Sequence, residues 1–165
     1  IGGGIPKGKK FKAVQTGGPS GGCLPESLLD LPVDYDELTK VGSMMGSGGM
    51  IVMDEDTSIV KNLFTFTRFY HHESCGQCSP CREGTGWMEK ILKKFLNGTA
   101  NESDVELLWD IQSKIEGKTI CPLGEAAAWP VAAAIRHFKQ EFLDIAKSKK
   151  FVDVSHYNRL NKITA

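Results

Sequence analysis

The chain has 165 residues, and its composition excludes several classes of protein. Apolar residues make up 41% and charged residues 24%, which is typical of a globular protein and argues against general disorder. Twenty basic residues balance twenty acidic ones, so we expect no nucleic acid or anionic lipid partner. The longest apolar run, Ala126–Ile135, contains a proline and is too short for a membrane helix. Because the sequence opens at Ile1 without Met or a signal segment, we expect it to be part of a longer protein.

Residues 1–57 are predicted to form a region of strands and loops. Twelve of the 18 glycines precede Met50, which indicates a boundary between this region and a helical one. The segments Phe11–Thr16 and Met50–Met53 are predicted strands, because the first alternates in polarity and the second is a short apolar run between turns. Residues Pro32–Lys40 are predicted to form a turn that leads into a helical turn.

Residues 58–147 are predicted to form four amphipathic helices, because apolar residues recur at helical spacing. The helices are expected from a cap at Ser58 to about His72, over about Gly84–Leu96, from Asn101 or Ser103 to Gly117, and over about Glu125–Lys147. Pro130 must lie in the first turns of the last helix or bend it. Four such helices with short connections indicate an α+β, mostly helical fold that contains a four-helix bundle. No fixed structure is expected for the tail, residues 148–165.

The cysteines carry the chemistry that the sequence predicts. Cys75, Cys78 and Cys81 form the pattern C-x-x-C-x-x-C, and Cys121 follows after 39 residues, directly before Pro122. Three thiolates spaced in this way on a loop can hold one side of an iron–sulfur cluster and leave one corner for a distant ligand. In an antiparallel bundle, the first and third connections lie at the same end, so all four cysteines are expected to meet there.

Other uses of these cysteines are possible. A structural zinc site is the main alternative, although zinc sites usually combine two C-x-x-C pairs, and the spacing favours a [4Fe–4S] cluster. Disulfides would require a secreted protein, and nothing in the sequence indicates one. Buried free thiols are a third alternative. Cys23 stands apart between glycines and Leu24, and we interpret it as a small hydrophobic residue outside the site.

The residues around the cysteines are compatible with a cluster. Backbone N–H groups are expected to point at the cluster sulfurs from Ser74, Gly76, Gln77, Gly84 and Gly86. Arg82 either stabilises the reduced cluster or pairs with Glu83 or another acid, and the sequence does not favour one of the two. His71 and His72 close the first long helix, where a histidine interacts favourably with the helix dipole.

One string extends these observations to a family resemblance. The string ESCGQCSPCREGTGW resembles the flavin-bearing, NADH-oxidising subunit of respiratory complex I and the related diaphorase subunits of NAD-linked hydrogenases and formate dehydrogenases. The family shares E-S-C-G-x-C-x-P-C-R-x-G, and every fixed position of that motif is met here. The matching segments are Glu73–Trp87, Gly42–Asp54, Ile115–Pro130 and Arg136–Phe138.

The resemblance implies a fold, cofactors and ligands. It implies that Cys75, Cys78, Cys81 and Cys121 ligate a [4Fe–4S] cluster in a four-helix domain at 58–147, and that residues 1–57 are part of a soluble-ligand-binding β-grasp region. In the family, electrons pass from NADH to FMN and then singly through this cluster to other iron–sulfur subunits. The FMN- and NADH-binding domain has no counterpart in this sequence, so FMN is expected only in a full-length parent protein.

The resemblance leaves the type of complex open. Membrane complex I is favoured over a soluble hydrogenase or formate dehydrogenase relative, because HFKQEFLDIAKSKKF resembles the end of the complex I proteins and no further ferredoxin-like cysteine run follows. We therefore expect redox subunits as partners, with NADH bound through the part that is not in this sequence. We also expect a cytoplasmic location, peripheral on the cytoplasmic face of the membrane and without direct membrane insertion.

Overall fold

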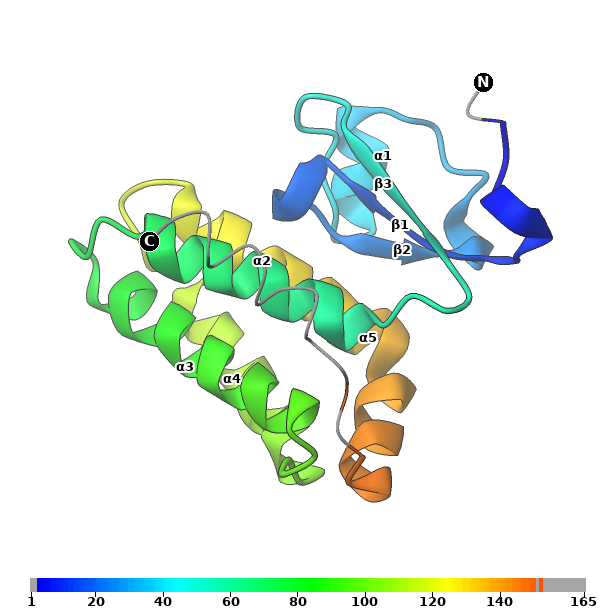
Figure 1. Ribbon diagram of the computed structural model, residues 1–165. Coiled ribbons are helices and arrows are strands. Elements are labelled where there is room, and N and C mark those ends of the chain that lie inside the picture. Colours follow the sequence, from blue (N-terminus) through cyan, green and yellow to red (C-terminus); the bar gives the residue numbers. More distant parts are fainter. Residues whose placement is uncertain (1–2, 151, 153–165) are drawn as a thin grey trace, which may run out of the picture.

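The computed structural model describes residues 3–150 and residue 152, which form a small sheet followed by four long helices (Figure 1). The strands are β1 (Phe11–Thr16), β2 (Cys23–Pro25) and β3 (Met50–Asp54). The helices are α1 (Tyr35–Lys40), α2 (Ile59–Glu73), α3 (Ser79–Leu96), α4 (Ser103–Ile115) and α5 (Leu123–Ser148). Short 3₁₀ turns occupy Pro6–Gly8, Gly18–Ser20 and Glu26–Leu28. The predicted α+β, mostly helical fold is confirmed.

The three strands form an antiparallel sheet in the order β2–β1–β3. Since side chains alternate along a strand, the two faces of β1 contact different parts of the chain. Ala13 joins the main core below the sheet, whereas its neighbour Val14 joins a smaller cluster with Leu24 and with Leu38 of α1. The sheet is therefore held between α1 on one face and the long helices on the other.

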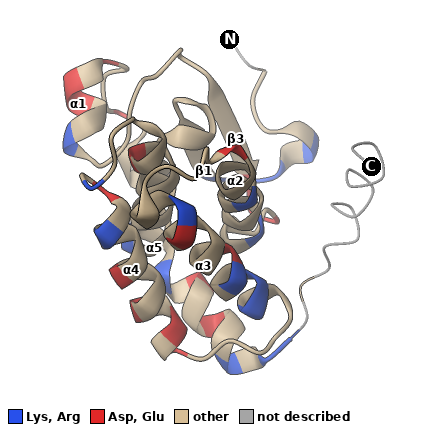
Figure 2. Cartoon of the chain, turned by 90° about the vertical axis from the view of Figure 1, so that its left-hand side faces the viewer, with Lys and Arg blue, Asp and Glu red and all other residues tan. Residues whose placement is uncertain are grey.

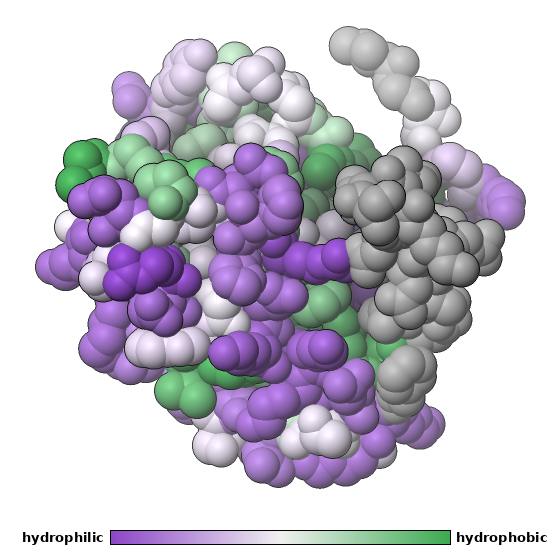
Figure 3. All heavy atoms as spheres, turned by 60° about the vertical axis from the view of Figure 1, so that its left-hand side comes forward, coloured by the Kyte–Doolittle hydropathy of each residue, from purple (hydrophilic) through white to green (hydrophobic). Residues whose placement is uncertain are grey.

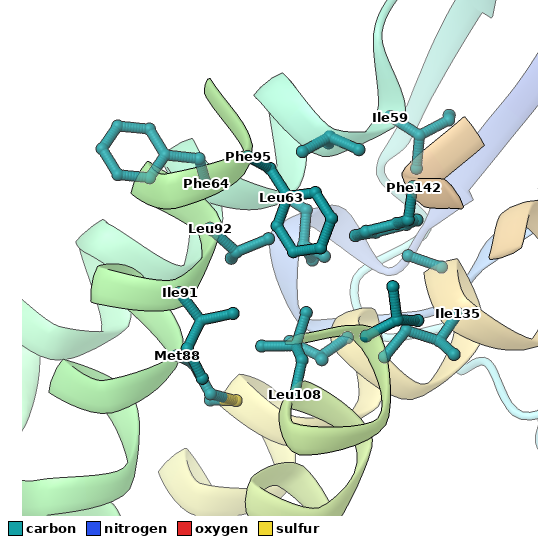
Figure 4. Packing of buried hydrophobic residues seen from close by; sticks show 14 of the residues in the cluster. Ile59, Leu63, Phe64, Met88, Ile91, Leu92, Phe95, Leu108, Ile135 and Phe142 are labelled. Carbon is teal, nitrogen blue, oxygen red and sulfur yellow. The ribbon is translucent and has the colours of Figure 1, made fainter. Parts of the chain in front are cut away.

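The main core lies between α2, α3, α4 and α5. Each of α2 and α4 packs against both α3 and α5. Figure 4 shows the side chains that meet there. Leu92 and Phe95 of α3 and Leu108 of α4 face Ile135 and Phe142 of α5. The rings of Phe95 and Phe142 make an edge-to-face contact at 5.5 Å between centroids, and both are fully buried. This packing is what fixes the ends of the helices relative to one another.

The beginning of α2 is held by residues far apart in the sequence. The hydroxyl of Ser58 accepts a hydrogen bond from the Lys61 N–H, as its predicted role as a cap requires. The carboxylate of Glu141 in α5 accepts hydrogen bonds from the Ser58 hydroxyl at 3.0 Å and the Ile59 N–H at 2.9 Å. Glu141 also pairs with Lys12 of β1 at 2.8 Å, so this one carboxylate joins the sheet to two helices.

Two features of the helices differ from the sequence-based expectation. Helix α3 begins at Ser79, five residues before the predicted start, because Cys78 takes the cap position and Pro80 fits the first turn, where no N–H is needed. Pro130 is buried in the third turn of α5 and the departure from helical geometry occurs instead at Phe138, with φ −129° and ψ 25°. The predicted tail at 148–165 lies outside the described residues except for 148–150 and 152.

The surface is polar and of mixed charge. Figure 2 shows acidic and basic side chains interspersed along the helices, which agrees with the balanced composition. Figure 3 shows a mostly hydrophilic face that is interrupted by separate hydrophobic patches. Among residues 3–150 and 152, no helix is both long and apolar enough to cross a lipid bilayer.

Candidate metal centre

Four cysteines from two separate segments of the chain line one small pocket at the same end of the long helices. The pocket has a volume of about 110 Å³ and is lined by Cys75, Cys78, Cys81 and Cys121 together with five neighbours. The α2–α3 connection supplies Cys75, and the α4–α5 connection supplies Cys121 from 46 positions further along the chain. The two connections lie together at the left of Figure 1. The expected meeting of the two cysteine segments is therefore observed.

The three closely spaced cysteines differ in their local structure. Cys75 lies in the loop and is exposed, whereas Cys78 is the cap of α3 and is half-buried. Cys81 lies in the first turn of α3 and is buried, so the expectation that all three occupy a loop is wrong for this residue. The loop turns at Gly76, whose φ of +78° is in the left-handed region that glycine adopts without strain.

The segment before Cys121 is held by the first turn of α5. The Glu125 carboxylate accepts hydrogen bonds from the Gly117 N–H at 3.0 Å and from the Thr119 hydroxyl at 3.3 Å. Thr119 lies so close to Gly124 that a Cβ at that position would come within 2.2 Å of the threonine oxygen. Gly124 is thus required for the close approach of this segment to α5, which brings Cys121 to the pocket.

Two hydrogen-bond donors lie next to the cysteine sulfurs. The Ile120 N–H donates to Cys78 Sγ at 3.4 Å, and the hydroxyl of Ser74 lies 3.2 Å from Cys81 Sγ. When Cys81 is a thiolate, the Ser74 hydroxyl must be the donor. The sequence predicts a backbone N–H donor at Ser74, whereas the structure has its hydroxyl at the sulfur. The Ile120 N–H was not predicted, because its contact with Cys78 joins segments that are distant in the sequence.

Gly84 and Gly86 have a different role from the predicted one. Both lie inside α3, where their N–H groups belong to the helix hydrogen bonds and do not point at sulfurs. A Cβ on Gly84 would come within 2.7 Å of the Ile115 side chain of α4, and one on Gly86 within 3.1 Å of the His71 ring of α2. These glycines therefore allow the neighbouring helices to approach α3 just beyond the cysteines.

Arg82 stabilises the shape of the cysteine loop. Its guanidinium donates to the Glu83 carboxylate at 2.9 Å, to the Gly76 carbonyl at 2.6 Å and to the Ser79 hydroxyl at 3.4 Å. The structure therefore shows the pairing of Arg82 with Glu83, which was one of its two predicted roles. The bond to Gly76 ties the loop to α3 through the arginine side chain.

The two histidines at the end of α2 both pair with acids. His71 Nδ1 lies 2.6 Å from the Glu89 carboxylate of α3, and His72 Nδ1 lies 3.1 Å from that of Glu73. Their position in the last turn of α2 is the predicted one. The His71 contact also joins α2 to α3 near the pocket.

Cys23 lies far from this pocket in the fold, on β2. Its side chain is only 3% exposed and belongs to the main core between the sheet and the helices. Burial raises the pKa of its thiol to about 12, so the thiol stays protonated near neutral pH. The structure agrees with the interpretation of Cys23 as a hydrophobic core residue.

The environment of the pocket fits an anionic group that is bound by several thiolates. Helix α3 begins at Cys78 and α5 begins directly after Cys121 and Pro122, so the positive ends of two helix dipoles lie beside three of the cysteines. Within the described part of the chain, no three His, Cys, Asp or Glu side chains are grouped so that they could hold a metal ion. The two helix N-termini are therefore the feature that favours an anionic ligand beside these cysteines.

The helical fold and its four-cysteine pocket are those of a protein that can bind a metal or an iron–sulfur cluster, and comparison with known proteins gives the family. Residues 61–145 match the family model described as the NADH-ubiquinone oxidoreductase-F iron-sulfur binding region. The chain belongs to this family. The predicted resemblance is thereby confirmed, and so is the prediction of an iron–sulfur cofactor.

Individual relatives agree with the family model. The chain is 48% identical over 138 residues to the F subunit of the NADH-quinone oxidoreductase of Rickettsia typhi, and 46% identical over 130 residues to an F subunit of the same enzyme from Rhizobium meliloti. These matches cover 84% and 78% of this chain but 33% and 30% of the relatives, so the chain spans about a third of their length. A crystal structure of an NAD+-reducing [NiFe]-hydrogenase matches 83% of this chain and 24% of its own, with a TM-score of 0.75 and 32% identity.

Proposed function

We propose that this chain is the cluster-bearing electron-transfer part of an NADH-oxidising subunit, and that Cys75, Cys78, Cys81 and Cys121 ligate one [4Fe–4S] cluster. The single observation that carries the proposal is that these four cysteines line one pocket although they come from two segments that are separated by 39 residues. A [4Fe–4S] cluster accepts and releases one electron at a time. The residues of the chain hold it in place and set how readily it is reduced.

Three features of the pocket favour this role. The hydroxyl of Ser74 and the N–H of Ile120 can donate to thiolate sulfurs, which stabilises the additional negative charge of a reduced cluster. The helix N-termini at Cys78 and Pro122 act in the same direction. Cys81 is buried while Cys75 and Cys121 are exposed, so one side of the pocket faces solvent, where an electron donor or acceptor can approach.

The zinc alternative is less well supported than a cluster. The family model that matches residues 61–145 is described as an iron-sulfur binding region. Zinc sites usually combine two C-x-x-C pairs, whereas three of these cysteines form one evenly spaced run. The comparison and the spacing therefore favour a cluster over a single zinc ion.

The wider assignments rest on the family resemblance. We propose that residues 1–57 belong to a β-grasp region, that 58–147 form a four-helix cluster domain, and that 148–165 form a C-terminal tail. FMN, NADH oxidation and the contact with other iron–sulfur subunits are assigned to the complete protein, because the chain spans only a third of the curated relatives. The names of those relatives favour an NADH-quinone oxidoreductase, and the hydrogenase match supports the alternative of an NAD-linked hydrogenase. We further propose a cytoplasmic location for the complete protein, peripheral on the membrane.

The ligand set can be tested by metal analysis of single variants. The anaerobically prepared chain should contain about four iron and four sulfide per chain, with a broad visible absorption that bleaches on reduction. Replacing Cys121 by Ser should remove or convert the cluster, whereas Cys23→Ser, in the core, should leave iron and sulfide unchanged. A colourless chain with one zinc, or an intact four-iron cluster in the Cys121 variant, would overturn the assignment.

A further inference from the structure

A second pocket lies away from the cysteines, between α1, α4 and α5. It has a volume of about 410 Å³, within the usual range for ligand sites, and it shares no lining residue with the cysteine pocket. We refer to it as the α4–α5 pocket. It is lined by Lys40, Trp109, Gln112, Glu116, Trp129 and Arg136, with further residues of α1, its following loop and the two long helices. We propose that this pocket binds a carboxylate that carries a hydrogen-bond donor beside it.

The pocket is built from matching faces of two helices. Trp109, Gln112 and Glu116 recur at helical spacing along one side of α4 and just beyond its end. Trp129 and Arg136 do the same on the facing side of α5. The indole N–H of Trp129 donates to the Glu116 carboxylate at 2.9 Å, which joins the two faces at one side of the pocket.

The positive charge of Arg136 in the pocket lining favours an anionic ligand. Arg136 is exposed, and among the described residues its guanidinium forms neither an ion pair nor a hydrogen bond with another side chain. The guanidinium lies against Gly42, where a Cβ would come within 2.2 Å of Nη1. The glycine thus leaves room for the arginine at the wall of the pocket. A planar guanidinium binds a carboxylate through two parallel hydrogen bonds, so such a group would satisfy it.

Gln112 provides a second group with unmet hydrogen-bonding capacity. Its side chain is 2% exposed and lines the α4–α5 pocket, and its Oε1 accepts no hydrogen bond in the part of the chain that the structure describes. A buried acceptor without a donor destabilises the fold, so such groups usually have a partner. An N–H or O–H donor on a bound molecule would supply one.

The other polar groups of the pocket are already engaged. Lys40 pairs with Glu37, and the hydroxyl of Thr39 donates to the Tyr35 carbonyl. The hydroxyl of Ser113 donates to the Asp110 carbonyl. The charged side chains that line the pocket are Lys40, Glu116 and Arg136, so cations outnumber acids. The two indole rings of the lining supply flat apolar surface for the body of the ligand.

The predicted ligand thus has three parts, a carboxylate for Arg136, a neighbouring N–H or O–H donor for Gln112, and an apolar body. Acylated amino acids and acidic residues within a protein segment share this chemistry. Both sources are compatible with the pocket, and two probes distinguish them. N-acetylphenylalanine represents a free small carboxylate, and N-acetylglutamate N-methylamide represents an acidic side chain as a protein presents it. N-acetylglutamine N-methylamide is the matched neutral molecule.

The experiment is a titration of the ¹⁵N-labelled, cluster-loaded chain followed by NMR, because the three tryptophans give three indole signals. Carboxylate probes should shift the signals of Trp109 and Trp129 and leave that of Trp87, which lies outside the pocket, unchanged. The neutral probe should cause no shift. Arg136→Gln should weaken binding at least tenfold, whereas Lys139→Gln on the exposed face of α5 should have no effect.

The outcomes separate support from refutation. Tighter binding of N-acetylphenylalanine supports a small-molecule site, and tighter binding of the glutamate probe supports docking of an acidic protein segment. The proposal is overturned if neither carboxylate probe saturates the pocket at about 20 mM while the thermal unfolding curve shows that the chain is folded. Equal binding of the neutral probe or unchanged affinity in Arg136→Gln would also overturn it. If that variant unfolds, Arg136→Lys replaces it, since the lysine keeps the charge and loses the paired hydrogen bonds.

Discussion

The hydroxyl of Ser74 gives the most direct means of changing the chemistry of the cysteine pocket at one residue. It lies 3.2 Å from Cys81 Sγ, the most buried of the three closely spaced sulfurs. A hydrogen bond to a cluster sulfur stabilises the reduced state more than the oxidised one, because reduction adds negative charge. Ser74→Ala should therefore lower the reduction potential by some tens of millivolts. This is roughly the potential that corresponds, in a one-electron couple, to part of the free energy of one hydrogen bond. A redox titration followed by visible absorption measures this shift.

Two further variants distinguish a hydrogen bond from a change in structure. Ser74→Thr keeps the hydroxyl and should keep the potential close to that of the unmodified chain. Ser79→Ala removes a hydroxyl of the same type from the first turn of α3, where that hydroxyl accepts a hydrogen bond from the Arg82 guanidinium. Equal shifts in Ser74→Ala and Ser79→Ala would show that the hydroxyl of Ser74 has no specific effect.

Cys23 should behave in the opposite way to the pocket cysteines toward alkylation. Its thiol is almost fully buried and burial raises its pKa to about 12, so the reactive thiolate is scarce at pH 8. Mass spectrometry after treatment with iodoacetamide should find Cys23 unmodified in the native chain and modified after unfolding in guanidinium. The exposed Cys75 and Cys121 should be modified in the cluster-free chain. Rapid labelling of native Cys23 would contradict the burial seen here.

At the residue scale, the sequence predicted that the two cysteine segments meet, but it did not predict the contacts that surround them. Cys75, Cys78 and Cys81 could be placed together from their spacing, because residues so close in sequence are also close in space. The Ile120 N–H that donates to Cys78 comes from a connection 42 residues away, so only the packed helices bring the two groups together. Gly84 was assigned to the cluster for the same reason, since its contact with Ile115 depends on how α3 and α4 pack.

At the scale of elements, the first turn of α4 is held by a carboxylate that responds to pH. Asp104 is 5% exposed, and burial alone would raise its pKa. The hydrogen bonds from Lys94 Nζ at 2.5 Å and from the Asn101 N–H at 2.7 Å outweigh that effect, so the pKa of Asp104 lies below its ordinary value. The arrangement resembles a capping box, in which a carboxylate reaches back to the start of the helix.

The lowered pKa of Asp104 predicts the sign of a pH effect. A carboxyl whose pKa is lower in the folded state stabilises the fold above its unfolded pKa of about 3.9, and the stabilisation is lost as the pH falls through the folded value. Asp104→Asn should reduce the free energy of unfolding by about 1–2 kcal/mol at pH 7. The difference between the two chains should decrease below pH 4. Urea unfolding at pH 7 and pH 3 measures both.

A matched control lies on the same helix. Asp110 pairs with Lys114 on the exposed side of α4, where its side chain is 56% exposed. Surface pairs of this kind contribute little, so Asp110→Asn should change stability by less than about 0.5 kcal/mol. Similar losses in the two variants would mean that the charge of α4, and not its buried cap, is the cause.

Elements with strong periodicity were predictable from the sequence, and short or context-dependent ones were not. Helices α2 and α4 match the prediction to within one or two residues, because their apolar faces and caps are local signals. β1 has its predicted bounds. β2 was missed because it has three residues, and its pairing with β1 is what makes it a strand. The start of α3 was placed too late because the cysteine motif itself forms the first turn.

At the scale of the whole molecule, the hydrophobic core and the cysteine pocket contribute to stability in different places. The core holds α2–α5 together through fully buried side chains such as Phe95 and Phe142, none of which lines the pocket. The pocket instead joins the α2–α3 connection to the α4–α5 connection at one end of the helices. A cluster bound by the four cysteines would therefore cross-link these two segments, whereas the core is packed through other side chains.

This separation predicts how the molecule responds when the cluster is removed. Ligands that bind only the folded state stabilise it, so the cluster-free chain should lose about 2 kcal/mol, or about 4–8 °C in Tm for a chain of this size. Its helical circular dichroism should remain, because the core is complete. Hydrogen exchange should accelerate at 74–78 and 117–122 and stay slow around Phe95 and Phe142. Acceleration over the whole of α3 and α5 would contradict this, since it would mean that the cluster holds the core together and does not only close its end.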